Sequence, residues 1–326
     1  MEQSKQRIDL NRDFPVRRSE KEKERFREAI TAHLSASGMH ARTEITKDGK
    51  NRNIVVGDPE TAEVILTAHY DTPAAALFPN LMIPRCKPLY YICQMIPILL
   101  ILALSLAGGY GFSLLLGGAS AAFLLGFLVL YYGIYFLGFR TFSNRHNAND
   151  NTSGVMTLLD LCDRLGAEGL RHAAVILFDN EEKGKKGSKA YAADHADAIQ
   201  NTPVLNFDCV GNGTHAVLIV KDEAREHRLY SALEAAFSEA VKAHPAYTVA
   251  FYPMKGSESN SDYKNFPCGI GAMACKRNRF GLLYTPWIHT PWDTVSSPEN
   301  TELFTDAACA FVRCVSERAF KPLSGE

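Results

Sequence analysis

Charged side chains are absent from one long part of this sequence. Between Pro88 and Phe139 there is no Asp, Glu, Lys, Arg or His, whereas the chain on either side is polar. A core helix of a soluble domain usually keeps a polar stripe, and this stretch has almost none. The absence argues against ordinary core helices or a soluble oligomer interface, and it favours insertion into a lipid bilayer.

Other absences argue against further classes of protein. The formal net charge is -1, so the chain lacks the basic excess typical of nucleic-acid binding, and we expect no nucleic-acid partner. The eight cysteines include no Cys-x-x-Cys pair, which argues against a cysteine zinc site. The first residues lack the apolar segment of a secretory signal, so we expect reduced thiols in the cytoplasm.

The uncharged segment divides at the glycines of Gly108–Gly111 into Leu89–Ala107 and Phe112–Phe139. A bilayer core needs about 20 apolar residues per helix. The pattern therefore predicts two transmembrane spans joined by a tight turn at these glycines, with the second span tilted or partly interfacial.

Basic residues flank the segment on both sides. Arg85 and Lys87 precede it, Arg140 and Arg145 follow it, and the connecting turn is uncharged. The positive-inside rule then places both ends in the cytoplasm. We expect a multi-pass protein of the cell membrane, with two spans and the rest of the chain facing the cytoplasm.

Small residues recur at helical spacing within the second span. Gly118, Ala122 and Gly126 form a small-xxx-small row, which suits close packing of helices in a membrane. The row makes a homo-oligomer possible, and the lipid bilayer itself is an expected partner.

The rest of the chain alternates strand-like and helix-like segments. Glu63–Ala68, Ala173–Phe178 and Pro203–Phe207 read as buried strands, and a turn at Asp48-Gly49 predicts a hairpin. The alternation predicts a three-layer α/β/α sandwich with a mixed central sheet. The charge-rich segment Ser19–Leu34 predicts a solvated surface helix.

Polar residues follow several of the apolar segments. They are His69 and Asp71, Asp150 in an Asn-rich turn, Glu181 and Glu182, Asp208, and His289 in an aromatic loop. Carboxylates at strand ends lie where α/β sheets place their sites. A neutral imidazole can bind a metal while its other nitrogen donates to a carboxylate. Taken singly, however, each segment also has an ordinary explanation as a cap or a solvated loop.

In their order and with their neighbours, these segments resemble the M28 family of dizinc peptidases, which includes bacterial aminopeptidases. Asn149–Gly154 resembles the family's N-D-N-x-S-G loop, Glu181–Ser188 its E-E-x-G-x-x-G-S element, and His289–Thr294 its final histidine motif. Ser261-Asp262 followed by Phe266 also fits. The resemblance covers roughly residues 40–318 apart from the uncharged segment.

The resemblance implies a role for each of these residues. Asp150 would bridge two metal ions. His69 and Asp208 would complete one metal site, and Glu182 and His289 the other. Glu181 would be the general base, and Asp71 would orient His69.

Donor chemistry agrees with this implication. Nitrogen and oxygen ligands without sulfur suit Zn²⁺, and also Co²⁺ or Mn²⁺. A metal-bridging hydroxide would neutralise two divalent ions held by three carboxylates, and Glu181 would pass a proton from water to the leaving amine. The resemblance thus implies a metallopeptidase, most simply an aminopeptidase, acting on peptide substrates.

The uncharged segment interrupts the connection between the His69 strand and the Asp150 loop, which typical members keep short. We therefore expect one peptidase domain from residues 1–87 and 140–326, with a helical segment at 1–40 and a transmembrane hairpin inserted at 88–139. We hypothesise that the site faces the membrane surface and that the hairpin restricts or recruits substrate.

Two other functions stay open at this point. One is a single-zinc acyltransferase of the glutaminyl cyclase type, which shares the fold but needs fewer ligands. The other is a non-catalytic membrane adaptor on a peptidase scaffold, against which the intact Glu181 argues. The sequence does not identify the residue that would hold a substrate's free amine, although Glu258 is a candidate.

Overall fold

The computed structural model describes residues 8–78 and 80–320. The strands are β1 Ala41–Ile45, β2 Arg52–Val56, β3 Val64–His69, β4 Asn80–Met82, β5 Ala173–Phe178, β6 Val204–Phe207, β7 His215–Val220, β8 Thr248–Pro253, β9 Gly269–Arg277 and β10 Leu283–Ile288. The α-helices are α1 Leu10–Asp13, α2 Glu20–Ala36, α3 Lys87–Leu115, α4 Ser120–Phe139, α5 Gly154–Gly169, α6 Lys186–Asp194, α7 Ala196–Ile199, α8 Asp222–Glu226, α9 Tyr230–Ala243 and α10 Pro298–Phe320. A π-helical turn, η1 Ala148–Ser153, and a 3-10 turn, η2 Asp262–Asn265, complete the described elements.

The sheet is mixed, as the sequence predicts. Its main path runs in the order β1-β2-β5-β3-β6-β9-β10-β4, and β7 joins β9 and β8. The central neighbours β5, β3, β6 and β9 are parallel, whereas β1, β2, β4, β7 and β10 bring antiparallel pairings. Parallel strands end at the same edge of a sheet, so residues that follow β3, β5 and β6 come close together.

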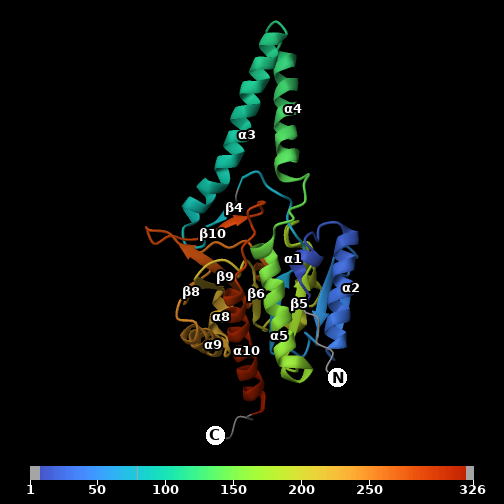
Figure 1. Ribbon diagram of the computed structural model, residues 1–326, viewed down its shortest axis with the longest axis vertical. Helices are drawn as coiled ribbons and strands as arrows, with labels where there is room; N and C mark the ends of the chain where they lie inside the picture. The colour runs from blue at the N-terminus through green and yellow to red at the C-terminus, as the bar shows by residue number, and fades with distance from the viewer. Residues whose placement is uncertain (1–7, 79, 321–326) are drawn as a thin grey trace.

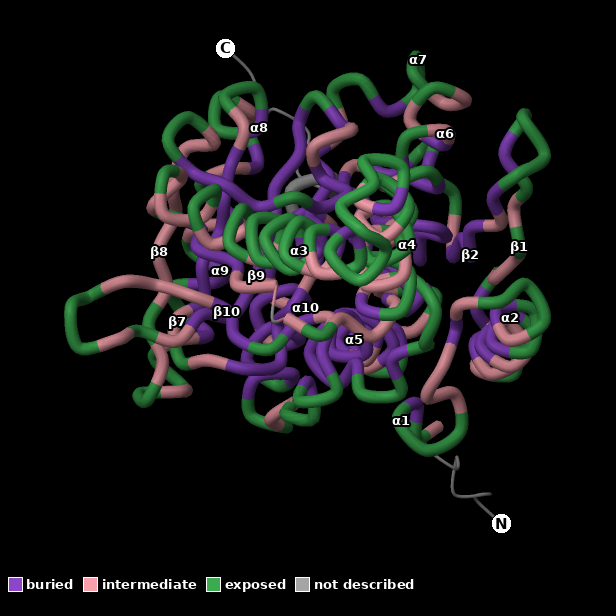
Figure 2. Tube along the Cα trace, turned by 90° about the horizontal axis from the view of Figure 1, so that it is seen from above, coloured by how far each residue is buried: buried purple, intermediate pink, exposed green. Residues whose placement is uncertain are grey.

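Side chains alternate between the two faces of the sheet, and each face has its own core. Ile54, Leu66 and Leu177 pack into the cluster on one face, which α5, α9 and α10 cover. Val55, Ile65 and Ile176 pack into the cluster on the other face, which α6 and α7 cover. Figure 2 shows α6 and α7 on one side of the buried strands and α5 and α10 on the other, which confirms the expected three layers.

Helix α2 is not the solvated helix expected from its charges. Ser19 caps it through a capping box with Glu22, but one face is buried and includes Lys23, Phe26 and Arg27. The Nζ atom of Lys23 lies 2.7 Å from Oδ1 of Asp179, far away in the sequence. The prediction of a solvated helix was wrong because Lys23 is buried beside Asp179, a partner that lies close only in the folded chain.

Helices α3 and α4 form a hairpin that projects from the body at the end where β4 and β10 lie (Figure 1). Both are long and apolar enough to cross a bilayer, and only 11% of the most apolar window of each is buried. Long apolar side chains such as Leu104, Leu125 and Val129 are exposed along them. An apolar surface of this size exposed to water would favour aggregation.

The hairpin turns later than the sequence predicts. Helix α3 continues through Gly108–Gly111, and the turn lies at Gly117 and Gly118, whose φ angles are +73° and +82°. The earlier glycines serve helix packing instead. A Cβ atom on Gly109 would lie 2.9 Å from the carbonyl oxygen of Phe123 in α4, and one on Gly126 would lie 3.2 Å from Gly109 Cα. Close approach of the two backbones, rather than reversal of the chain, therefore requires small residues here.

The base of the hairpin is joined to the body on both sides. Strand β4, which precedes α3, pairs with β10 next to His289. The backbone N–H of Leu77 donates to the carbonyl of Gly138, and Phe78 stacks on Phe139 with ring centroids 6.2 Å apart. The hydroxyl of Tyr91 donates to Glu258. The hairpin therefore stands on the segments that surround the candidate site.

Candidate metal centre

Three neighbouring parallel strands bring the first candidate residues together. His69 is the last residue of β3, Glu181 and Glu182 follow β5, and Asp208 follows β6. His289 follows β10, and Asp150 lies in the π-helical turn before α5. The fold thus collects at one edge of the sheet all of the metal ligands that the family resemblance implies.

The ligand atoms form two groups that share Asp150. In the first, Nε2 of His69 lies 3.3 Å from Oδ1 of Asp150 and 3.7 Å from Oδ1 of Asp208. In the second, Nε2 of His289 lies 3.0 Å from Oδ2 of Asp150 and 3.3 Å from Oε2 of Glu182. Within each group the donor atoms lie within 4.8 Å of one another. The two oxygens of the Asp150 carboxylate therefore face different groups.

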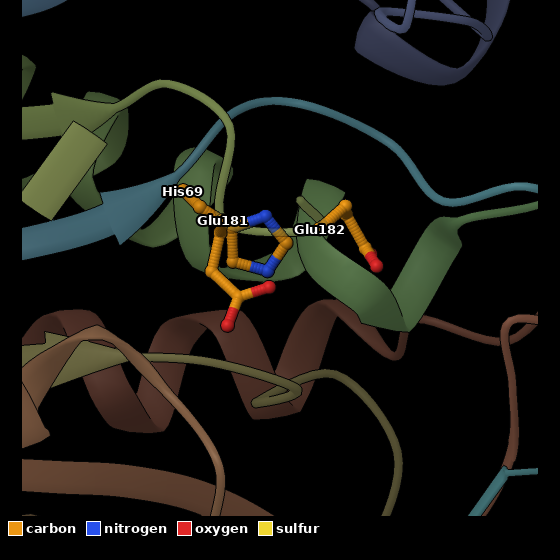
Figure 3. A group of neighbouring side chains, drawn as sticks. All are labelled: His69, Glu181 and Glu182. Carbon is orange, nitrogen blue, oxygen red and sulfur yellow. The ribbon is translucent and has the colours of Figure 1, made fainter. Parts of the chain in front are cut away.

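Glu181 lies beside these groups. Figure 3 shows the side chains of Glu181 and Glu182 on either side of the His69 imidazole, extending from the loop after β5. A carboxylate oxygen of Glu181 belongs to a cluster with His69 and Glu182 whose atoms lie within 4.8 Å of one another. A base at this position can exchange a proton with a small molecule in the centre.

The loop that carries Asp150 is fastened by its own Asn and Ser side chains. The amide of Asn151 accepts from the N–H groups of Gly154 and Cys209, and it donates to the carbonyl of Phe207. Ser153 accepts from the N–H of Val210. These contacts join the start of α5 to the segment after β6 and fix Asp150 relative to Asp208.

Asp71 supports the site in two ways. Its carboxylate accepts the backbone N–H groups of Glu181 at 2.9 Å and Glu182 at 3.2 Å. Its main-chain carbonyl oxygen lies 3.1 Å from Nδ1 of His69, closer than its carboxylate at 3.6 Å. With Nδ1–H donating to that carbonyl, Nε2 of His69 is left free to face Asp150.

Sequence reasoning missed Arg17, which lies behind the centre and is fully buried. Its guanidinium donates to the carbonyl of Tyr70 at the end of β3, and to Asn147 and Thr152 on either side of the Asp150 loop. Burial lowers the pKa of Arg17 to about 10, still well above neutrality, so a cation faces the acidic cluster from behind. Nothing in the local sequence around Arg17 distinguishes it from the neighbouring basic residues.

Burial strongly shifts the pKa values of several acidic residues of the centre. Burial raises the pKa of Glu182 to about 8 and that of Asp262 to about 7, and it raises the pKa of Glu181 well above its ordinary value. Burial lowers the pKa of His289, but Glu182 and Asp150 outweigh it and raise the value to about 10. Burial and the neighbouring carboxylates therefore favour the protonated forms of Glu181, Glu182 and Asp262.

Three residues next to the site adopt a left-handed backbone. They are Asn180 before Glu181, Cys209 after Asp208, and His289 itself, with φ angles of 54°, 60° and 63°. Such conformations are uncommon for residues other than glycine and gather at functional sites. Each of them redirects the chain where a candidate ligand or base leaves its strand.

A cavity of about 260 Å³ opens onto the centre. Besides the candidate ligands it is lined by Asn80, Met82 and Tyr90 from the hairpin base, and by Ser259 and Asn260. Glu258 does not line it, because its carboxylate pairs with Lys264 at 2.5 Å and accepts from Tyr91. Glu258 therefore joins the hairpin to the body instead of facing the cavity as a free carboxylate.

The donor set fits divalent cations such as zinc. It consists of two imidazoles and three carboxylates, and oxygen and nitrogen donors of this kind suit Zn²⁺. Oε1 of Glu182 is buried without a hydrogen-bond partner. An unsatisfied buried carboxylate oxygen is costly, and a metal ion at this position would satisfy it.

The fold resembles those of several enzymes of known structure. A Zn-dependent exopeptidase from Parabacteroides distasonis matches with a TM-score of 0.54 and 16% identity, over 93% of this chain and 92% of that chain. Glutaminyl cyclase from Bacteroides thetaiotaomicron matches with a TM-score of 0.55 and 15% identity, over 93% and 94%. The LapA aminopeptidase of Legionella pneumophila matches with a TM-score of 0.52 and 13% identity, over 93% and 67%.

Fold and site together define an α/β/α protein with a mixed sheet and a candidate metal centre. The family model for peptidase family M28 matches residues 138–312, more than half of the chain, and the chain belongs to this family. The search of curated proteins gave no match. The family resemblance predicted from the sequence is thus confirmed.

Proposed function

We propose that this protein is a membrane-anchored dizinc aminopeptidase. His69, Asp208 and Asp150 would hold one zinc ion, and Glu182, His289 and Asp150 the other. The observation that carries the proposal is the pair of ligand groups that meet at the Asp150 carboxylate, with Glu181 beside them.

Two zinc ions at these positions would polarise the scissile carbonyl and lower the pKa of a water molecule. The protein's own residues supply the rest. Glu181 would take the proton of the attacking water and deliver it to the leaving amine. Its buried surroundings raise its pKa, which suits a carboxylate that must hold a proton between these two events.

The supporting residues would keep this geometry constant during turnover. Asp71 fixes the backbone of both Glu181 and Glu182, so the base and a ligand move together. Asp293 holds the backbone N–H groups of Asn149 and Asp150 at 3.0 and 2.9 Å. Reacting groups held in this way lose little orientation entropy at the transition state.

Membrane anchoring rests on the hairpin. Helices α3 and α4 expose apolar side chains along their length and carry no charge between Pro88 and Phe139. Basic residues flank both ends at the base, which would keep the peptidase domain on the cytoplasmic side. The domain would comprise residues 1–87 and 140–326, with 88–139 as the inserted hairpin.

A glutaminyl-cyclase-like function is the alternative, because a glutaminyl cyclase is among the structural neighbours. A single-zinc enzyme needs one ligand group, whereas here both groups are complete. Metal analysis separates the two: two zinc ions per chain support the peptidase, and one supports the cyclase. A non-catalytic adaptor would have no use for Glu181.

The test is a panel of peptides with free and with blocked N-termini, assayed on zinc-loaded protein in detergent. We expect cleavage of the free set only, and loss of cleavage in Glu181→Gln with zinc retained. Cleavage of both sets would make the enzyme a peptidase that does not require a free amine. Equal activity in Glu181→Gln would contradict the assigned role of the base.

A further inference from the structure

A second cavity, of about 280 Å³, lies on the other side of the candidate centre, at the foot of the hairpin. It shares Glu182 and His289 with the first cavity, so the two meet at the same pair of ligands. Phe139 and Arg140, at the end of α4, form part of its wall. Arg18 and Lys183 also line it.

The second cavity is positively charged. Its cations come from three separate segments: Arg18 before α2, Arg140 after α4, and Lys183 after the acidic pair. The Arg18 guanidinium donates to the main-chain carbonyls of Arg140 and Thr141. All three cations lie in the lining of the cavity. Asp71 and Glu182 also line the cavity and bring two carboxylates, so the three cations leave an excess of positive charge.

The first cavity has a different character. Apart from the candidate ligands and Glu181, its lining is uncharged and includes Asn80, Met82, Tyr90, Ser259, Asn260 and Met273. A cleft with an excess of charge of one sign concentrates ligands of the opposite sign. A peptide lying across the centre would therefore meet a neutral cavity on one side and a cationic cavity on the other.

We propose that the cationic cavity binds a carboxylate on the leaving side of the substrate. The inference rests on the proposed aminopeptidase function. A free amino terminus is a cation, so Arg18, Arg140 and Lys183 would repel it into the neutral cavity. The residue after the scissile bond then lies in the cationic cavity, which selects an anionic group there.

Size narrows the substrate class further. Both cavities fall below the roughly 300–1,000 Å³ typical of pockets for drug-sized ligands. The C-terminal carboxylate of a dipeptide is the simplest anion that would reach the cationic cavity. An acidic side chain at the same position offers the same chemistry.

Binding can be measured without turnover on the zinc-loaded Glu181→Gln protein in dodecyl maltoside. Calorimetry would compare Leu-Ala with Leu-Ala amide, and Leu-Glu amide with Leu-Lys amide. We expect Leu-Ala to bind about three- to tenfold more tightly than its amide, as for a charge-assisted contact at a partly exposed site. If Leu-Glu amide binds more tightly than Leu-Lys amide by a similar factor, a side chain can also supply the carboxylate.

Variants at Arg140 assign the effect to the cavity. In the Glu181→Gln background, Arg140→Gln should remove most of the preference for the free acid, and Arg140→Glu should reverse the order of Leu-Glu amide and Leu-Lys amide. Arg145→Gln is the matched control, because Arg145 is exposed on the same segment and does not line the cavity. It should keep the preference of the parent protein.

Equal binding of Leu-Ala and its amide would overturn the proposal. So would loss of the preference when phosphatidylglycerol is added to the micelles, because the cavity would then be a site for lipid headgroups. Wild-type protein separates this failure from failure of the proposed function. Hydrolysis of the free acid and the amide at equal rates would contradict the carboxylate subsite alone. No hydrolysis of any peptide would contradict both the subsite and the proposed aminopeptidase function.

Discussion

Oδ2 of Asp293 accepts the backbone N–H of Asp150 at 2.9 Å, and its other oxygen accepts the neighbouring N–H of Asn149. Asp293 thereby sets the position of the residue that both ligand groups share. In Asp293→Asn one oxygen becomes an NH₂ group, which cannot accept either N–H. We expect zinc affinity to fall about 10–100-fold, the usual cost of losing a group that orients a ligand.

Competition with a chromophoric chelator measures that affinity. Asp197→Asn is the control, because Asp197 is an exposed carboxylate remote from the centre in the fold. It should bind zinc as the wild type does. Unchanged affinity in Asp293→Asn would show that the Asp150 loop holds its shape without this contact.

Arg17 should be a large contributor to stability. Arg17→Met leaves the carbonyl of Tyr70 and the side chains of Asn147 and Thr152 without their donor. We expect the free energy of unfolding to fall by about 1–3 kcal/mol, the usual cost of leaving buried acceptors without a hydrogen bond. Chemical denaturation in mild detergent measures it, with the exposed Arg12→Gln as a control that should not change. If the free energy of unfolding changes as little in Arg17→Met as in the control, water can replace the guanidinium as the hydrogen-bond donor.

The metal-free protein should become less stable as pH rises. The pKa values of Glu182 and Asp262 are raised by burial to about 8 and about 7, so the folded state binds more protons than the unfolded state between about pH 4 and pH 8. Stability from these groups is complete below about pH 4 and is lost as pH rises through their folded pKa values. His289, with its pKa raised to about 10, extends the loss to higher pH.

Thermal unfolding of chelator-treated protein at pH 5.5 and pH 8.5 checks this dependence. We expect a lower midpoint at pH 8.5, and a larger stabilisation by added zinc there, because metal replaces the bound protons. A metal-free midpoint that rises between these two pH values would contradict the assigned protonation of the acidic cluster.

Removing the distal hairpin tests the anchor. A flexible linker in place of residues 95–135 keeps Tyr90 and Tyr91 at one foot and Phe139 and Arg140 at the other. We expect this protein to leave the membrane fraction while still binding zinc, because the candidate ligands all lie in the body. Full-length protein that is soluble without detergent, or a truncated protein that stays in the membrane, would argue against anchoring by α3 and α4.

Much of the site can be predicted from the sequence because its residues lie at the ends of short apolar strands. β5 coincides with the predicted strand Ala173–Phe178, and Glu181 lies three residues after its end. The contacts that support the site are harder to predict, because they join residues that are far apart in the sequence. Asp293 and Asp150 are an example, as are Lys23 and Asp179.

Glycine shows why a local pattern can mislead. The cluster Gly108–Gly111 predicts a turn, yet the chain turns at Gly117 and Gly118. A glycine that reverses the chain and one that admits a neighbouring helix look alike until the partner helix is known.

Diffraction at the zinc absorption edge tests the central claim most directly. Anomalous difference maps of zinc-loaded crystals should contain two peaks: one among His69, Asp150 and Asp208, and one among Asp150, Glu182 and His289. A single peak, or peaks away from Asp150, would contradict the dizinc centre and the peptidase mechanism built on it.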